Sequence, residues 1–251
     1  MKIDKVTYEV DLSDGDKRPI YVWEAPVRVW HWLMVVTMFT MIVTGYLIGR
    51  PLDANLGNTW ATFQFADIRM IHFIAGICFT GLFVYRIFWA FMGNRYAHQI
   101  FLPPFWSFKF LKGIWDQALY YLFIKKTSPE YAAHNPLAAT AMFGFFVLGS
   151  FCIIITGLAL YGQPYGAGSG WDIMTGWVFA LFGDNAQAVR TFHHALMYVF
   201  TLFMVAHFYM AAREEHHGRR NGNVRHHEWT PHVQAREVIL TSFRTIPLDR
   251  G

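Results

Sequence analysis

Four long apolar segments divide the chain, at about 29–48, 68–92, 137–161 and 188–212, and short polar stretches bound each of them. The third opens with Asn135-Pro136, a favourable helix N-cap followed by proline at the first helical position. A helix of about 20 mostly apolar residues is long enough to cross the hydrocarbon layer of a bilayer. The pattern therefore predicts an all-α membrane protein built as a four-transmembrane-helix bundle.

A fifth apolar segment, 105–124, differs from these four because charged residues interrupt it. It follows a Pro-Pro pair and contains Lys109, Lys112 and Asp116 among tryptophans and tyrosines. Charges and aromatic residues mixed in this way are typical of a helix that lies in the headgroup region. We therefore expect a cytoplasmic interfacial amphipathic segment between spans two and three, rather than a fifth span.

The composition is that of a membrane protein, and the distribution of lysines and arginines along the chain predicts its orientation. The 251 residues are 54% hydrophobic and 15% charged, whereas soluble domains carry about 25% charged residues. With four spans, both termini and the loop between spans two and three share one side, which holds most of the 21 lysines and arginines. The positive-inside rule makes this side cytoplasmic. We expect a cytoplasmic N-terminal tail (1–27), a transmembrane domain (28–212) and a basic cytoplasmic tail (213–251), with no nucleic-acid binding.

Of the 12 histidines, four lie at informative positions within the apolar segments, namely His31, His72, His193 and His207, and ionisable residues there are costly and usually functional. His193 and His207 are 14 residues apart, which is close to four helical turns, so they share one helix face about 21 Å apart along the axis. In the predicted topology His31 lies at the depth of His207, near the cytoplasmic side. His72 lies at the depth of His193, near the opposite side. The sequence thus predicts two histidine pairs, one near each membrane surface.

Paired imidazoles can fill both axial positions of a haem iron, which favours electron transfer over substrate binding. The chain has no Cys-x-x-Cys-His motif for a covalently attached haem. We therefore expect two haem b groups, with the inner iron bound by His31 and His207 and the outer iron by His72 and His193. Two alternatives remain: a histidine–metal site, which would need further carboxylate or thiolate ligands, and histidines that are only hydrogen-bonded core residues.

Two further residues fall at the depths of these pairs. Gly45 follows His31 by 14 residues and places a small residue at the outer level. Arg86 follows His72 by 14 residues and brings a cation to the inner level, where a guanidinium could bind haem propionates. Each has an alternative role, because glycines in spans commonly serve helix packing and Arg86 could extend to the cytoplasmic interface.

His194 competes with His193 as the outer ligand on the fourth span. On a helix it would lie about 100° round from its neighbour and off the face that His193 shares with His207. We therefore prefer His193.

Several motifs around these histidines resemble the b-type cytochrome subunit of membrane-bound nickel–iron hydrogenases. They are EAPVRVWHW at 24–32, TGY at 44–46, RMIHF at 69–73, YRIFWAFMGNRY at 85–96, HNP at 134–136, the histidines at 193 and 207, and YMAARE at 209–214. The resemblance covers roughly residues 20–215 in order. The later tail matches nothing in that pattern, and a histidine is not expected at position 194.

The resemblance implies an electron-transfer and quinone-reducing subunit of a hydrogen:quinone oxidoreductase, which would not be catalytic for hydrogen by itself. The implied partners are the hydrogenase small (iron–sulfur) and large (nickel–iron) subunits, membrane lipid and quinone, in the bacterial cytoplasmic (inner) membrane. Electrons would travel from the small subunit through the outer and inner haems to a quinone near the cytoplasmic surface. Cytochrome subunits of formate dehydrogenase and thiosulfate reductase are similar in outline. A haem-free structural membrane anchor is the alternative from a different class.

Overall fold

The structure is a computed structural model that describes residues 17–20, 24–51, 63–94, 97, 99–126, 134–220 and 233–236. The chain divides into two compact units. One comprises Pro26–Trp89 with Met142–Met210, and the other comprises Met1–Ala25, Ala90–Ala141 and Ala211–Gly251. The first unit holds most of the long helices.

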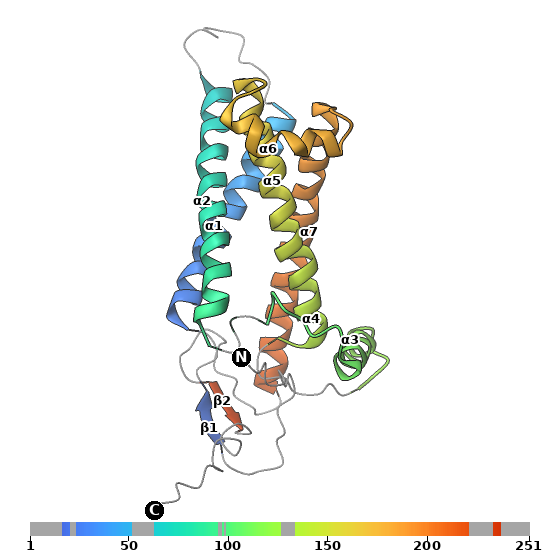
Figure 1. Cartoon of the computed structure of the whole chain (residues 1–251). Coiled ribbons are helices and arrows are strands. Elements are labelled where there is room, and N and C mark those ends of the chain that lie inside the picture. Colours follow the sequence, from blue (N-terminus) through green and yellow to red (C-terminus); the bar gives the residue numbers. More distant parts are fainter. Residues whose placement is uncertain are drawn as a thin grey trace, which may run out of the picture. The chain divides into compact units, whose positions relative to one another are not determined.

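Four helical segments of the described chain are long and apolar enough to cross a membrane. They are α1 (Ala25–Gly49), α2 (Gln64–Met92), a third segment at Pro136–Tyr165, and α7 (Ala186–Arg220), which qualifies as far as Arg213. Within the first unit, α1, α2, α5 and α7 run alongside one another and alternate in direction (Figure 1). The predicted four-helix membrane bundle is confirmed.

The third segment is not a uniform α-helix. It consists of α4 (Pro136–Ala141), the π-helical η1 (Met142–Leu148), α5 (Gly149–Gly162) and the 3-10 turn η2 (Gln163–Tyr165). The predicted N-cap is confirmed, because the Asn135 side-chain oxygen accepts a hydrogen bond from the Ala138 backbone N–H at 2.8 Å. The π-helical stretch, which the sequence analysis did not predict, carries the buried ring of Phe146.

A short helix, α6 (Gly170–Leu181), follows the third segment and was also not predicted. Its N-cap, Ser169, accepts a hydrogen bond from the Asp172 backbone N–H at 3.1 Å. Val178 is buried in a cluster with Ala159 of α5 and Val189 of α7. Hydrophobic contacts thus attach α6 to both spans that it connects.

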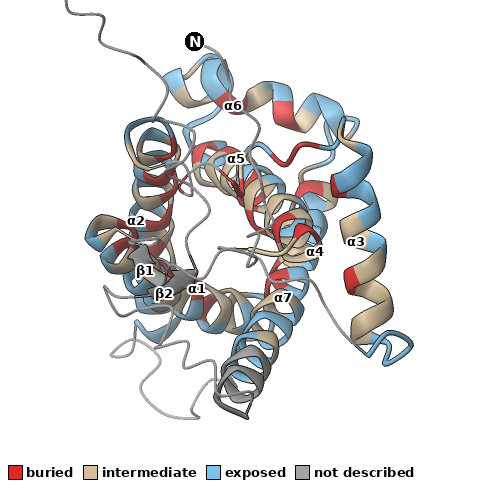
Figure 2. Ribbon diagram, turned by 90° about the horizontal axis from the view of Figure 1, so that it is seen from below, coloured by how far each residue is buried: buried red, intermediate tan, exposed pale blue. Residues whose placement is uncertain are grey.

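The bundle buries one face of each long helix and exposes another. Figure 2 shows buried residues on the inward sides and exposed residues on the outward sides. In the core, the rings of Phe79 on α2 and Phe200 on α7 meet edge to face at 6.5 Å. Val36, Phe88 and Leu202, in contrast, are 56–69% exposed. Large apolar side chains on the outward faces suit a hydrocarbon solvent, because no water needs to be excluded from them.

In the second unit, α3 (Phe108–Tyr121) packs on the start of the third segment. Phe110 is buried against Ala139 of α4, and the Asn135 side-chain amide donates a hydrogen bond to the Tyr121 hydroxyl at 3.0 Å. The opposite side of α3 is open, and there apolar side chains such as Trp115, 65% exposed, lie beside the exposed Lys109 and Lys112. This two-sided helix occupies the segment in which an amphipathic helix was predicted.

The second unit also contains a two-stranded antiparallel ribbon made from the two ends of the chain. Strand β1 (Lys17–Ile20) pairs with β2 (Val233–Arg236), so that Lys17 lies opposite Arg236 and Ile20 opposite Val233. The sequence analysis assigned only polar tails to 1–27 and 213–251, and it did not predict this pairing. The fourth span was predicted to end near residue 212 and ends at Arg213, and the helix α7 continues beyond the span to Arg220.

Candidate functional site

The structure brings the four histidines predicted as ligands together two by two. The ring centroids of His31 and His207 are 6.4 Å apart, and those of His72 and His193 are 6.5 Å apart. A metal–imidazole bond is about 2.0–2.1 Å long, so a metal ion held between two imidazole nitrogens separates the ring centroids by roughly 6 Å. Both pairs therefore have the spacing of axial ligands on a shared metal ion.

In the outer pair, two threonine hydroxyls determine the tautomers of the rings. Thr44 Oγ1 lies 2.8 Å from His72 Nδ1, and Thr156 Oγ1 lies 2.9 Å from His193 Nδ1. Each hydroxyl donates its own proton to the carbonyl four residues earlier, at 2.7 Å in both cases. A hydroxyl has one proton to donate, so each must accept from the histidine Nδ1–H. This leaves the Nε2 lone pair of both rings available to a metal.

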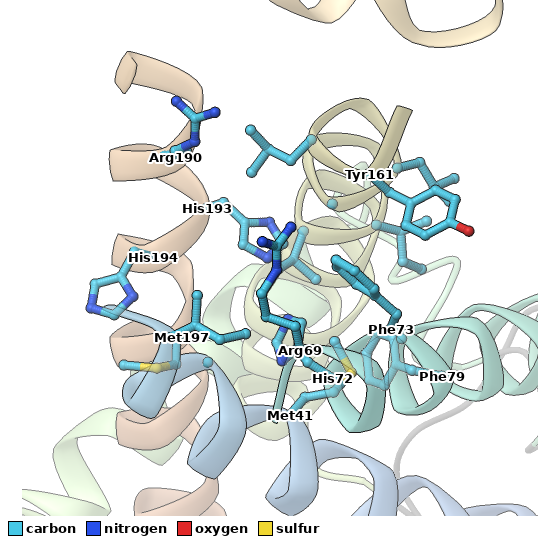
Figure 3. Close-up of a pocket in the computed structure, with 18 of the residues that line it drawn as sticks. Met41, Arg69, His72, Phe73, Phe79, Tyr161, Arg190, His193, His194 and Met197 are labelled. Atoms are coloured by element: carbon cyan, nitrogen blue, oxygen red, sulfur yellow. The ribbon is translucent and has the colours of Figure 1, made fainter. Parts of the chain in front are cut away.

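A cavity of about 740 Å³ opens beside the outer pair, within the range of cofactor pockets. Side chains from α1, α2, α5 and α7 line it, and most of them are apolar. Figure 3 shows the residues around this cavity, with His72 and His193 among them. The chain thus offers two opposed imidazoles in an apolar space large enough for a flat organic group.

Two glycines make room for the outer histidine rings. A Cβ atom on Gly45 of α1 would lie 3.3 Å from His72 Cε1, and one on Gly157 of α5 would lie 3.1 Å from His193 Cε1. Both distances are tighter than ordinary van der Waals contact. Gly45, predicted only as a small residue at the outer level, therefore lies directly against a histidine ring.

His194 occupies a different side of α7 from His193 (Figure 3). Its ring meets Tyr198 edge to face at 5.3 Å and fills the space above Gly49 of α1, where a Cβ would lie 2.5 Å from His194 Cε1. His193, and not His194, is the ring paired with His72. The preference for His193 rested on helix geometry, and this arrangement agrees with that geometry.

At the inner pair, aromatic rings surround the two histidines. The ring of Phe203 stacks on His207 at 5.7 Å with an interplanar angle of 23°, and Trp32 meets His31 edge to face at 5.5 Å. Phe145, from the π-helical stretch, stacks in turn on Phe203 at 6.2 Å. The irregular turn of the third segment thus contributes to the surroundings of the inner pair.

Arg86 is buried, with 2% of its surface exposed. Its guanidinium carbon lies 5.3 Å from the ring centroid of Trp30, the residue before His31. The Trp30 ring nitrogen donates a hydrogen bond to the Leu82 carbonyl at 2.8 Å, which fixes the ring on which the cation rests. Arg86 therefore lies within the bundle, as the propionate-binding role requires, rather than extended to an interface.

The sequence analysis missed five polar residues of the outer site: Thr44, Thr156, Arg69, Arg190 and Gln163. The threonines gave no signal, because their partners depend on how the helices are rotated against one another. For the arginines a signal existed. Each precedes a predicted ligand by three residues, as Arg69 does His72.

Four membrane-crossing helices that hold two facing histidine pairs define a multi-pass membrane protein of the b-type cytochrome class. The comparisons with known proteins agree. The family described as prokaryotic cytochrome b561 matches residues 22–224. The chain therefore belongs to the prokaryotic cytochrome b561 family.

Curated relatives are similar over most of their length. A protein of Azotobacter chroococcum mcd 1 is 41% identical over 211 residues, covering 82% of this chain and 88% of the relative. One of Escherichia coli (strain K12) is 41% identical over 197 residues, covering 78% and 83%. One of Cupriavidus necator is 37% identical over 201 residues, covering 80% and 82%. Each is named a probable Ni/Fe-hydrogenase B-type cytochrome subunit, the Escherichia coli protein that of hydrogenase 1.

Proposed function

We propose that this protein carries electrons across the bacterial cytoplasmic membrane through two b-type haems, as the quinone-reducing subunit of a hydrogen:quinone oxidoreductase. The observation that carries the proposal is the pair of facing imidazoles at each of two levels of one bundle. The b-type cytochrome family of the chain and the hydrogenase names of its relatives support it.

The residues of the chain fit haem at both levels. His72 and His193 would bind the outer iron, and His31 and His207 the inner iron, within the transmembrane domain at 28–212. Haem b supplies a carrier that accepts and releases one electron at a time. The protein would supply the imidazole nitrogens that hold each iron, and Arg86 brings a buried positive charge to the inner level. Because His193 and His207 are 14 residues apart on α7, the two levels are separated by about 21 Å along that helix.

The two faces of the membrane would have different partners. We place both termini and α3 on the cytoplasmic side, with the exposed aromatic and lysine side chains of α3 in the headgroup region, because basic residues favour that side. The iron–sulfur small subunit and the nickel–iron large subunit of the hydrogenase would then lie on the outer face, near His72 and His193. Quinone would be reduced near the cytoplasmic surface, on the side of His31 and His207.

The direct test is the complex itself, purified from membranes in mild detergent. We expect both hydrogenase subunits to co-purify and hydrogen gas to give a reduced b-type spectrum, which added quinone then reoxidises. A cytochrome that co-purifies with a formate dehydrogenase, and is reduced by formate instead, would assign the chain to another quinone-linked complex. A folded preparation without haem would refute the proposal and leave the haem-free structural membrane anchor as the remaining hypothesis.

A further inference from the structure

Two arginines of the outer cavity have no role in the function proposed above, although both line the cavity beside the histidine pair. We propose that Arg69 and Arg190 together bind the carboxylates at the edge of the outer cofactor, and so fix which edge faces the nearer ends of α2 and α7. The inference rests on the proposed function, because it concerns how the same cofactor is held.

The first argument is the position of each arginine on its helix. Arg69 precedes His72 by three residues on α2, and Arg190 precedes His193 by three residues on α7. Residues three apart lie on one face of a helix, about 4.5 Å apart along its axis. Both helices begin shortly before these arginines, at Gln64 and Ala186. Each cation therefore lies between a ligand and the membrane surface nearest to it.

The second argument is the charge of the cavity. Its lining includes two guanidinium groups among mostly apolar side chains, and no aspartate or glutamate occurs among its lining residues within the described part of the chain. Both arginines are exposed near the starts of their helices, so their cationic groups lie at one end of a cavity whose lining is otherwise mostly apolar. Two carboxylates on an otherwise apolar ligand would match this lining, with the acidic edge at the arginines and the apolar body deeper in the bundle.

The third argument is the way each guanidinium is held. Arg190 Nη2 donates a hydrogen bond to Gln163 Oε1 at 2.6 Å, which uses one of the five N–H donors of the group. The guanidinium of Arg69 lies over the rings of Phe65 and Phe73, with its central carbon 6.0 and 5.7 Å from their centroids. These contacts hold both guanidiniums at the cavity, where their remaining N–H donors can bind a carboxylate bidentately. Figure 3 labels both arginines with the two histidines around the cavity.

The test compares Arg69→Gln, Arg190→Gln and the double variant with Arg50→Gln in the purified complex. Arg50 is exposed at the end of α1 and does not line the cavity, so its replacement is a matched loss of charge. The readouts are haem per polypeptide and the midpoint potentials in a redox titration, in which the outer component is the one that His193→Ala removes. Bound phospholipid phosphorus is measured in parallel.

We expect the double variant to lower the midpoint potential of the outer component, because a nearby cation favours the reduced haem, or to lose that haem. Each single variant should give a smaller shift in the same direction, and Arg69→Lys should shift less than Arg69→Gln because it keeps the charge. Arg50→Gln should leave both components at their wild-type potentials.

Two wild-type potentials in the double variant, with full haem content, would overturn the inference and leave the proposed function standing. Loss of bound phosphorus with unchanged potentials would also overturn it, because a lipid phosphate would then be the anion. A wild-type complex without haem would instead refute the proposed function itself.

Discussion

At the scale of single residues, the outer site depends on two hydroxyl groups as much as on its histidines. Thr44 and Thr156 each accept a hydrogen bond from a histidine Nδ1–H and donate one to a backbone carbonyl. Such partners orient a metal-ligating ring and raise its basicity. The hydroxyls therefore orient the two imidazole rings for an iron that the hydroxyls themselves would not bind.

This arrangement predicts the effect of removing either hydroxyl. Thr44→Val or Thr156→Val should weaken haem binding at the outer site by about 10–100-fold, the usual range for a lost partner of a metal ligand. Haem that remains should titrate at a higher midpoint potential, because a less basic imidazole stabilises the oxidised iron less. Haem retention during dilution and a redox titration would measure both effects.

Thr40→Val is the matched control. The Thr40 hydroxyl donates a hydrogen bond to the Val36 carbonyl at 2.9 Å, and within the described part of the chain no hydrogen bond joins it to a histidine. Equal haem loss from Thr40→Val and Thr44→Val would mean that the hydroxyls act through helix stability alone.

The glycines beside the outer rings give a second residue-scale prediction. Gly157→Ala would bring a methyl group within 3.1 Å of His193 Cε1, and overpacking of this kind costs about 1–3 kcal/mol. We expect a lower thermal midpoint and partial loss of the outer haem. Gly81→Ala, where a Cβ meets nothing within 4 Å, should retain both. If the two variants behave alike, the close fit around His193 does not matter for the site.

The sequence predicts those site residues whose positions follow from spacing along one helix, and it misses those whose contacts depend on how neighbouring helices are rotated. The pairing of His193 and His207 with partners at matching depth needed only spacing along helices and an even number of spans. The hydrogen bonds of Thr44 and Thr156 needed the rotation of each helix about its axis, which spacing along a single helix does not specify.

At the scale of elements, the third membrane segment differs most from expectation. Its apolar run predicted one regular helix, but a π-helical stretch, Met142–Leu148, interrupts it. A π-helical turn changes the direction of the side chains that follow it, and here Phe145 and Phe146 reach different rings, Phe203 and Trp30. A π-helical stretch depends on the packing of neighbouring helices, so the hydropathy profile of the sequence does not predict it.

The start of the same segment gives an element-scale prediction. Asn135→Ala removes the side chain that caps α4 and binds the Tyr121 hydroxyl, and the loss of a cap costs about 1 kcal/mol. We expect a lower thermal midpoint in detergent with an unchanged haem content. Asn135→Ser retains a capping oxygen and should recover most of the loss. No difference between alanine and serine would show that the cap contributes little.

At the scale of the whole molecule, hydropathy predicted the number of spans well, because a bilayer requires long apolar helices of nearly fixed length. It did not predict α6 or the ribbon of β1 and β2. The α6 segment is short, and its apolar residues do not form a run long enough to stand out. The ribbon joins residues more than 200 positions apart, as Lys17 and Arg236 are, and no local pattern indicates such a pairing.

The orientation of the chain is also tested at this scale. A periplasmic reporter, alkaline phosphatase, inserted at Gly168 between the third span and α6, should be active, whereas a fusion at the C-terminus should be inactive. A fluorescent protein fused at the C-terminus should be fluorescent, because it matures in the cytoplasm. The reverse result at both positions would mean that the protein has the opposite orientation in the membrane, with His72 and His193 on the cytoplasmic side.

The central claim is that two histidine pairs each hold one haem, and haem counting tests it most directly. Pyridine haemochrome analysis of the purified protein should give two haems b per polypeptide. His193→Ala and His207→Ala should each retain one, with different midpoint potentials, and His194→Ala should retain two. Loss of haem from His194→Ala with full retention in His193→Ala would contradict the account.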